Sequence, residues 1–230
     1  LPINPDNDLL LSYSEGFRAP TFNDLYYPDT KYSNPNLQPE TSKSYELQWR
    51  SQLTDSTRLE ASLYRTDLSD AIILDSTSKP QNVASARIDG FEAALKQNLF
   101  GWQGNLGVSI IDPRDRDTGH TLARRARRTL NLDLDRQFDT LGLGASWQAI
   151  SSSYDDEDNA QRLGGYGLLG LRSSWALNRE VALSLKVDNV LDKSYARARY
   201  SYNDPAFLNN QDYREEGRVW RVGVTWTPEI

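Results

Sequence analysis

The feature that most constrains this chain is a recurring alternation of apolar and polar side chains with a period of two residues. In segment 130–135, three leucines alternate with one asparagine and two aspartates. Because successive side chains of a strand point to opposite faces, this alternation predicts strands with one apolar and one polar face. With two less regular segments, 9–17 and 165–177, the sequence predicts about ten strands. The alternating segments are 45–50, 59–64, 91–96, 102–110, 130–135, 141–148, 181–188 and 220–226.

The connections between the predicted strands alternate in length. Short connections are expected at 54–56, 98–101, 137–140 and 178–180. Long polar connections are expected at 18–41, 112–124, 151–164 and 197–217. Short turns at one end and long loops at the other are typical of an antiparallel up-and-down β-meander.

The length of the alternating segments favours a membrane barrel over a soluble sheet. Several segments alternate for roughly 8–11 residues, which is the length of a tilted transmembrane strand, whereas strands of soluble proteins have a mode of about 5–6. Within those segments, no Asp, Glu, Lys or Arg occupies the apolar positions. Aromatic residues flank the short turns and the long loops, as at a bilayer interface. We expect an all-β transmembrane β-barrel, with a soluble all-β protein as the alternative.

Composition removes several other classes of protein. The chain has no Cys and a single His, His120, so thiolate sites and multi-His metal centres cannot form within it. No run of about 18 apolar residues occurs, which excludes transmembrane helices. The net charge of −6 argues against a nucleic-acid partner. Because the chain begins with Leu1 and lacks Met, we expect it to be a piece of a longer polypeptide.

A series of motifs in a consistent order resembles the TonB-dependent outer-membrane receptors of Gram-negative bacteria. Each motif alone is modest, but together they cover nearly the whole chain. They are YSEGFRAPTFNDLY at 13–26, NPNLQPE at 34–40, NVASARIDGFE at 82–92, VDNVLDKSY at 187–195 and GRVW at 217–220.

The resemblance implies a monomeric 22-stranded barrel whose lumen holds an N-terminal plug. Residues 1–230 would then be the C-terminal part of that barrel, without the plug and without the segment that contacts TonB. An open sheet cannot expose its edges to lipid, which agrees with missing strands, and a closed ten-stranded barrel is kept as the alternative. Polar side chains on the luminal face would hold the plug, among them Glu46, Gln48, Glu92, Lys186 and Arg221.

Within this family, two further elements resemble the receptors for cobalamin (vitamin B12). They are TLARRA at 121–126 and SYDD at 153–156. The resemblance implies a cobalamin ligand with Arg124, Arg125 and Tyr154 as ligand-binding residues, since Arg donates readily to amide carbonyls and phosphate. The alternatives are a receptor for a ferric siderophore or another bulky solute, and arginines that only balance nearby acidic charges.

The remaining polar clusters support weaker hypotheses. Acidic residues gather at 112–117 and 155–158, but neither spacing matches a calcium-binding loop, so we expect solvated loops and no metal or other cofactor. His120 could serve a barrel hydrolase only with a paired acid or Ser, and no such motif accompanies it. We therefore expect no catalytic residue. A barrel enzyme using His120 and a soluble β-protein that binds sugars or other partners remain as rivals.

Overall fold

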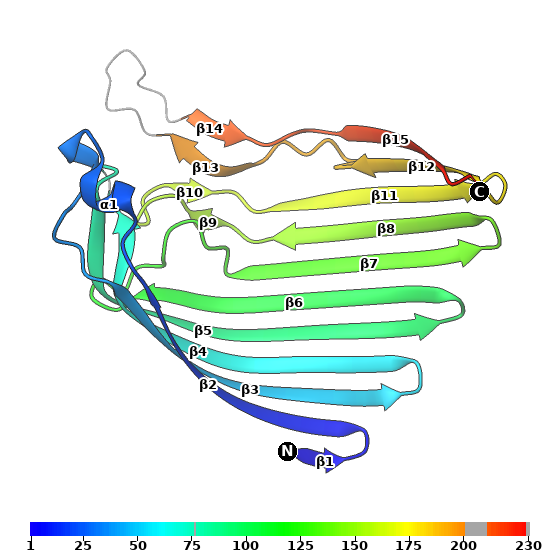
Figure 1. Ribbon diagram of the computed structural model, residues 1–230, viewed down its shortest axis with the longest axis horizontal. Helices are drawn as coiled ribbons and strands as arrows, with labels where there is room; N and C mark the ends of the chain where they lie inside the picture. The colour runs from blue at the N-terminus through cyan, green and yellow to red at the C-terminus, as the bar shows by residue number, and fades with distance from the viewer. Residues whose placement is uncertain (76, 201–210, 229–230) are drawn as a thin grey trace.

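The computed structural model describes residues 1–75, 77–200 and 211–228, which form an 11-stranded antiparallel sheet. Each strand pairs with the next one along the sheet, from β1 at one edge to β15 at the other (Figure 1). The strands are β1 (Pro2–Asn4), β2 (Asn7–Arg18), β3 (Glu40–Thr54), β4 (Thr57–Leu74), β5 (Pro80–Leu99), β6 (Trp102–Asp115), β7 (Arg128–Phe138), β8 (Leu141–Ile150), β11 (Tyr166–Ala176), β12 (Val181–Asp188) and β15 (Val219–Trp226). The predicted all-β meander is confirmed.

Several strands extend well beyond the alternating segments that predicted them. Strand β4 has 18 residues and β5 has 20, and both run past the expected span toward the long loops. Strand β6 continues to Asp115, so the long connection begins later than the expected position 112. Tilted strands of about 9–11 residues suffice to cross a bilayer, and the extra length therefore projects beyond it.

The long connections contain local structure that the sequence did not predict. They hold helix α1 (Phe22–Tyr26), the 3₁₀ helix η1 (Thr30–Tyr32) and two small hairpins. One hairpin pairs β9 (Ser153–Tyr154) with β10 (Arg162–Leu163), and the other pairs β13 (Ala196–Tyr200) with β14 (Gln211–Arg214). Part of the expected 197–217 connection lies outside the described residues. Within the described ranges, no helix is long and apolar enough to cross a membrane.

The short turn between β5 and β6 contains two consecutive residues with positive φ. The turn between β5 and β6 places Phe100 at φ +52° and Gly101 at φ +80°. Two consecutive residues with positive φ match the twist of a tight antiparallel hairpin, and glycine adopts this geometry without steric cost. The turns gather at the right of Figure 1 and the long loops at the left.

The sheet is a single layer that leaves its apolar face uncovered. Cross-strand pairing aligns Leu47, Leu63, Phe91 and Ile110 in one apolar row. Leucines and valines of this face are 37–83% exposed in several strands; Leu143, for example, is 39% exposed. Nothing in the described part of the chain packs across that face, which argues against a soluble sandwich with a buried interior. The apolar face is instead ready to contact lipid.

Candidate functional site

The three residues predicted to bind ligand lie among the long connections. Arg124 and Arg125 follow β6, and Tyr154 belongs to β9. The backbone N–H of Arg124 donates to the carbonyl oxygen of Tyr154 at 2.6 Å, so the structure brings these two residues together. The chain turns at Arg124, which has φ +56°. Arg125 is exposed, and its side chain has no hydrogen bond or ion pair with any described residue.

Asp155 joins three loops at this site. Its carboxylate accepts from the Arg124 Nε at 2.9 Å and from the backbone N–H of Arg199, in β13, at 3.0 Å. The Asp155 side chain is only 9% exposed, whereas that of Arg124 is 56% exposed. The expectation of a solvated acidic loop is therefore wrong for Asp155. A carboxylate that holds two donors fixes the Arg124 guanidinium in place at the loop surface.

A second junction ties the connection after β6 to the β9–β10 hairpin. The Asn159 side chain donates to the Thr121 carbonyl at 2.8 Å, and its amide oxygen accepts from the Thr121 N–H at 2.8 Å. The His120 Nδ1 donates to the backbone oxygen of Glu157 at 3.0 Å. His120 is thus held by a backbone carbonyl, and none of its hydrogen bonds to described residues involves an acid side chain or a Ser.

Glu157 is a partly buried titratable group of these loops. One of its carboxylate oxygens is inaccessible to solvent and lacks a hydrogen-bond partner among the described residues. Partial burial raises the pKa of this carboxyl, and nearby acidic residues raise it further, with Asp75 the strongest of them. The described residues nevertheless contain no group of three or more His, Cys, Asp or Glu that could hold a metal ion.

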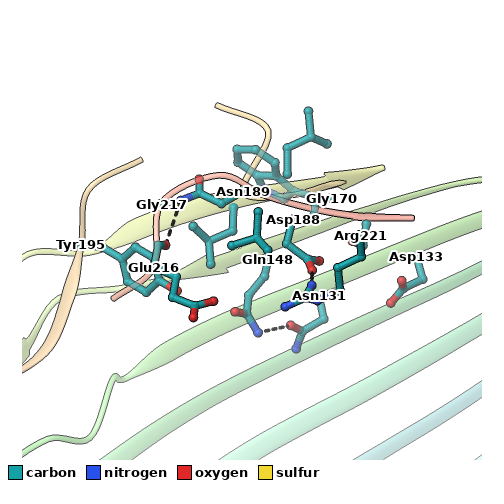
Figure 2. Close-up of a pocket in the computed structure, with 15 residues that line it drawn as sticks. Asn131, Asp133, Gln148, Gly170, Asp188, Asn189, Tyr195, Glu216, Gly217 and Arg221 are labelled. Carbon is teal, nitrogen blue, oxygen red and sulfur yellow. Dashed lines mark hydrogen bonds and ion pairs between the residues drawn. The ribbon is translucent and has the colours of Figure 1, made fainter. Parts of the chain in front are cut away.

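The polar face of the sheet carries the second part of the site. A hollow of about 400 Å³ lies on this face, lined by residues of β7, β8, β11, β12 and β15 and of the connection between β12 and β15. Figure 2 shows these residues. The Gln148 side chain donates to the Asn131 amide oxygen at 3.0 Å, and Arg221 pairs with Asp188. These side chains therefore hydrogen-bond to or pair with one another. They also present donors and acceptors to the space of the hollow.

A charged cluster continues this polar face toward the short turns. Arg172 of β11 pairs with Asp133 at 3.3 Å and bonds Asp135 through its Nε at 2.8 Å, and both aspartates belong to β7. Glycine at 144 makes room for this arrangement, because a Cβ there would lie 2.5 Å from the Arg172 Nε. Lys186 and Arg221 are cross-strand partners on the same face.

Sequence reasoning placed Asp133, Lys186 and Arg221 on the polar face but missed their partners. Asp188 was expected on that face too, from the alternating segment 181–188, and Arg172 lies there by the same alternation, so the period of two could have indicated both as partners. Asp155 is different, because no pattern in its own loop indicates a contact with residues 31 and 44 positions away. Only the folded arrangement of three separate connections brings those groups together.

A single-layer antiparallel sheet with an uncovered apolar face, a polar opposite face and long loops at one end defines part of an outer-membrane β-barrel. The chain belongs to the TonB-dependent receptor family, since the family model described as "TonB dependent receptor-like, beta-barrel" matches residues 3–190. This is a family of transporters and not of enzymes, which answers the alternative of a barrel hydrolase acting through His120.

The chain is similar to two curated relatives. The vitamin B12 transporter BtuB of Vibrio vulnificus (strain YJ016) is 30% identical over 224 residues, covering 95% of this chain and 35% of that protein. The protein of the same name from Photobacterium profundum is 28% identical over 210 residues, covering 86% and 34%. The chain therefore spans about a third of the length of the curated relatives it matches.

Solved structures share the fold at lower sequence identity. A ferric enterobactin receptor, PfeA of Pseudomonas aeruginosa, superposes with a TM-score of 0.80 at 21% identity, covering 98% of this chain and 38% of that one. The ferric yersiniabactin uptake receptor FyuA of Yersinia pestis gives a TM-score of 0.77 at 19% identity, covering 97% and 35%. At this identity the likeness shows the fold alone.

Proposed function

We propose that residues 1–230 are the C-terminal part of the barrel of a receptor that binds cobalamin and imports it with energy from TonB. The observation that carries the proposal is the likeness to two vitamin B12 transporters along nearly the whole of this chain. The extracellular loops bind the solute, and the polar face of the sheet lines the lumen that the plug occupies. TonB acts on the plug, outside this chain, and not on the sheet described above.

The loop cluster around Asp155 suits a large, partly polar solute. Arg125 is exposed, and its side chain has no hydrogen bond or ion pair with a described residue. The Arg124 guanidinium is held at the surface by Asp155. Cobalamin carries amide groups and a phosphate, which an Arg fork recognises through short charge-assisted hydrogen bonds. In the proposed site Arg125 and Arg124 donate to the solute, and Tyr154 borders the contact next to Arg124.

Equilibrium binding to the full-length receptor tests the ligand. Purified protein in detergent is titrated with cyanocobalamin, ferric enterobactin and ferric yersiniabactin in parallel. The proposal expects tight binding of cyanocobalamin alone. If a ferric siderophore binds tightly and cyanocobalamin does not, the solute is the siderophore and not cobalamin. The assignment to the receptor class would be unaffected.

A pair of matched variants tests the residues. Arg125→Gln removes one charge from the proposed site, and Arg179→Gln removes one from a short turn at the opposite end of the sheet. A lost charge-assisted hydrogen bond predicts about a tenfold rise in the Kd for cyanocobalamin in the first variant and none in the second. Equal affinities in both variants would remove Arg125 from the site.

A further inference from the structure

The lipid-facing side of the sheet changes from apolar to charged residues near the long loops. Its last wholly apolar row over β2–β6 aligns Leu11, Leu47, Leu63, Phe91 and Ile110. The next row begins with the rings of Tyr13 and Tyr45, whose centroids lie 5.0 Å apart with their planes tilted by 41°. That row and the one beyond it then become charged. The charged residues of β4–β6 in these two rows, together with Arg127, form what we call the outer charged band: Arg65, Asp67, Arg87, Asp89, Asp112, Arg114 and Arg127.

Three ion pairs of the band share one geometry. Arg65 reaches Asp89 at 2.6 Å, Arg87 reaches Asp67 at 2.7 Å and Arg114 reaches Asp112 at 2.9 Å. In each pair the Arg Nε meets the Asp Oδ1, so one edge of the guanidinium is fixed by the neighbouring carboxylate. Among the described residues, the terminal amino groups of Arg65 and Arg87 have no further hydrogen-bond partner. They remain available to an acceptor from outside the protein.

Stability alone does not account for this band. Ion pairs between half-exposed side chains contribute about 0–1 kcal/mol each. The four arginines of the band are 30–51% exposed at their side chains, so they are accessible. They also outnumber its three aspartates, although the whole chain carries a net charge of −6. The surplus of accessible donors therefore points to an acidic partner on the membrane side of the barrel.

The depth of the band matches a head-group layer. Two residues of strand rise about 7 Å, so the two charged rows begin directly above the apolar rows and span roughly that height. The polar layer of one leaflet is about 5–8 Å deep. Tyrosine at the boundary row is typical of a bilayer interface. The band therefore lies beside the head groups of the outer leaflet and not beside the solute in the lumen.

We propose that the outer charged band binds the phosphate groups of an outer-leaflet lipid. The Arg guanidinium is the side chain best suited to phosphate, because it donates two parallel hydrogen bonds from a planar fork. Asp89 and Asp67 bind the Nε of Arg65 and Arg87, and this leaves the terminal amino groups of both forks to the lipid. The inference depends on the outer-membrane location of the barrel and is independent of which solute the receptor carries.

Lipid binding to the full-length receptor tests the proposal. The protein is reconstituted into phosphatidylcholine nanodiscs containing a minor fraction of bisphosphorylated lipid A or of its dephosphorylated form, and co-purifying lipid is quantified by mass spectrometry. The variant carries Arg65→Gln, Arg87→Gln and Arg114→Gln. The matched control carries Arg58→Gln, Arg136→Gln and Arg179→Gln, which remove the same charge at the short-turn end.

The expected result is at least a tenfold loss of bound bisphosphorylated lipid in the band variant, with binding retained in the control. The dephosphorylated lipid should bind weakly to all proteins, and added inorganic phosphate should not displace the lipid. Full binding by the band variant, equal loss in the control, equal binding of the dephosphorylated lipid or complete displacement by phosphate would each overturn the proposal.

Two further measurements keep the test decisive. If the triple variant does not fold, Arg87→Lys alone retains the charge and loses the fork, and it should still bind several-fold less lipid than the wild type. Unchanged lipid binding in a folded Arg87→Lys protein would contradict the role of the fork. Solute affinity, measured on the same samples, should not change, so a failure of the transport proposal would be seen separately.

Discussion

The sheet and the loop end of this molecule are stabilised in different ways. In the sheet, apolar side chains such as Leu11 (83% exposed) and Val222 (78% exposed) are largely uncovered by protein. At the loop end, Leu37 is 7% exposed and Ala86 is 1% exposed, while Pro113 is fully buried. The sheet therefore depends on lipid to cover its apolar face, whereas the loop end carries a small protein core of its own.

Hydrogen bonding differs in the same way. The sheet is held by regular backbone ladders between neighbouring strands, whose pattern any alternating sequence can adopt. At the loop end, individual side chains join distant segments. The Asn82 side chain, for example, accepts from the Gln38 N–H at 2.8 Å and donates to the Gln38 carbonyl at 3.1 Å. The effect of a substitution in the sheet should therefore depend on the environment that its face meets. The effect of a substitution in the loops should depend on the specific partner that is lost.

The largest effect is expected from placing a charge on the lipid-facing side. Leu132→Arg in the middle of β7 should destabilise the full-length barrel in lipid vesicles by about 2–4 kcal/mol, because a charge at mid-bilayer is poorly solvated. Asn131→Arg, one residue earlier, faces the polar side and should cost about 1 kcal/mol through its lost bond to Gln148. Denaturant unfolding measures both. Equal losses would mean that the two faces do not meet different environments.

The next effect concerns side-chain packing within the sheet. The Tyr64 ring lies against Gly90, where an added Cβ would clash with the Tyr64 Cζ. Gly90→Ala should therefore destabilise the barrel by about 1–3 kcal/mol through overpacking. Gly107→Ala is the matched control, because a Cβ there meets only the Asn131 carbonyl oxygen at 4.0 Å. Truncating the ring with Tyr64→Ala should remove the penalty at position 90, and its persistence would locate the strain elsewhere.

The same contrast explains how much could be predicted from the sequence. Alternation alone predicted the strands, their faces and the polar position of Asp133, because a strand's side-chain period is local and fixed. It could not predict that the lipid-facing side becomes charged at Arg65 and Asp89, since alternation does not say where the apolar stretch must end. Nor could it find the partners of Asp155, which come from connections far apart in the chain.

A smaller, local effect is expected at the junction of the loops. Asp155→Asn keeps the shape of the side chain but removes the charge that holds Arg124 and the Arg199 N–H. Because Arg124 is more than half exposed, the loss should be about 1 kcal/mol and confined to the loops. Hydrogen exchange should accelerate in β9 and β13 and stay unchanged in β3 and β4. Acceleration across the whole sheet would show that the two regions are coupled.

The smallest effect concerns pH. Burial and the neighbouring acids raise the pKa of Glu157, so its carboxyl is protonated more readily in the folded loop than in the unfolded chain, where the ordinary value is 4.5. The stabilisation is therefore complete below that value and is lost as the pH rises through the folded pKa. The facing titratable groups are Asp75, Asp115, Asp156 and Asp158, with His120 bound to the Glu157 backbone oxygen.

Glu157→Gln should remove this pH dependence, because a neutral amide in the same position cannot ionise. Hydrogen-exchange protection of residues 155–161, corrected for the intrinsic rate, should fall with rising pH in the wild type and stay level in the variant. Asp158→Asn is the control, since it removes one neighbouring charge and should only weaken the step. If protection in Glu157→Gln falls with rising pH as much as in the wild type, another acid is responsible for the titration. If protection in β7 falls over the same pH range, the loop end does not titrate independently of the sheet.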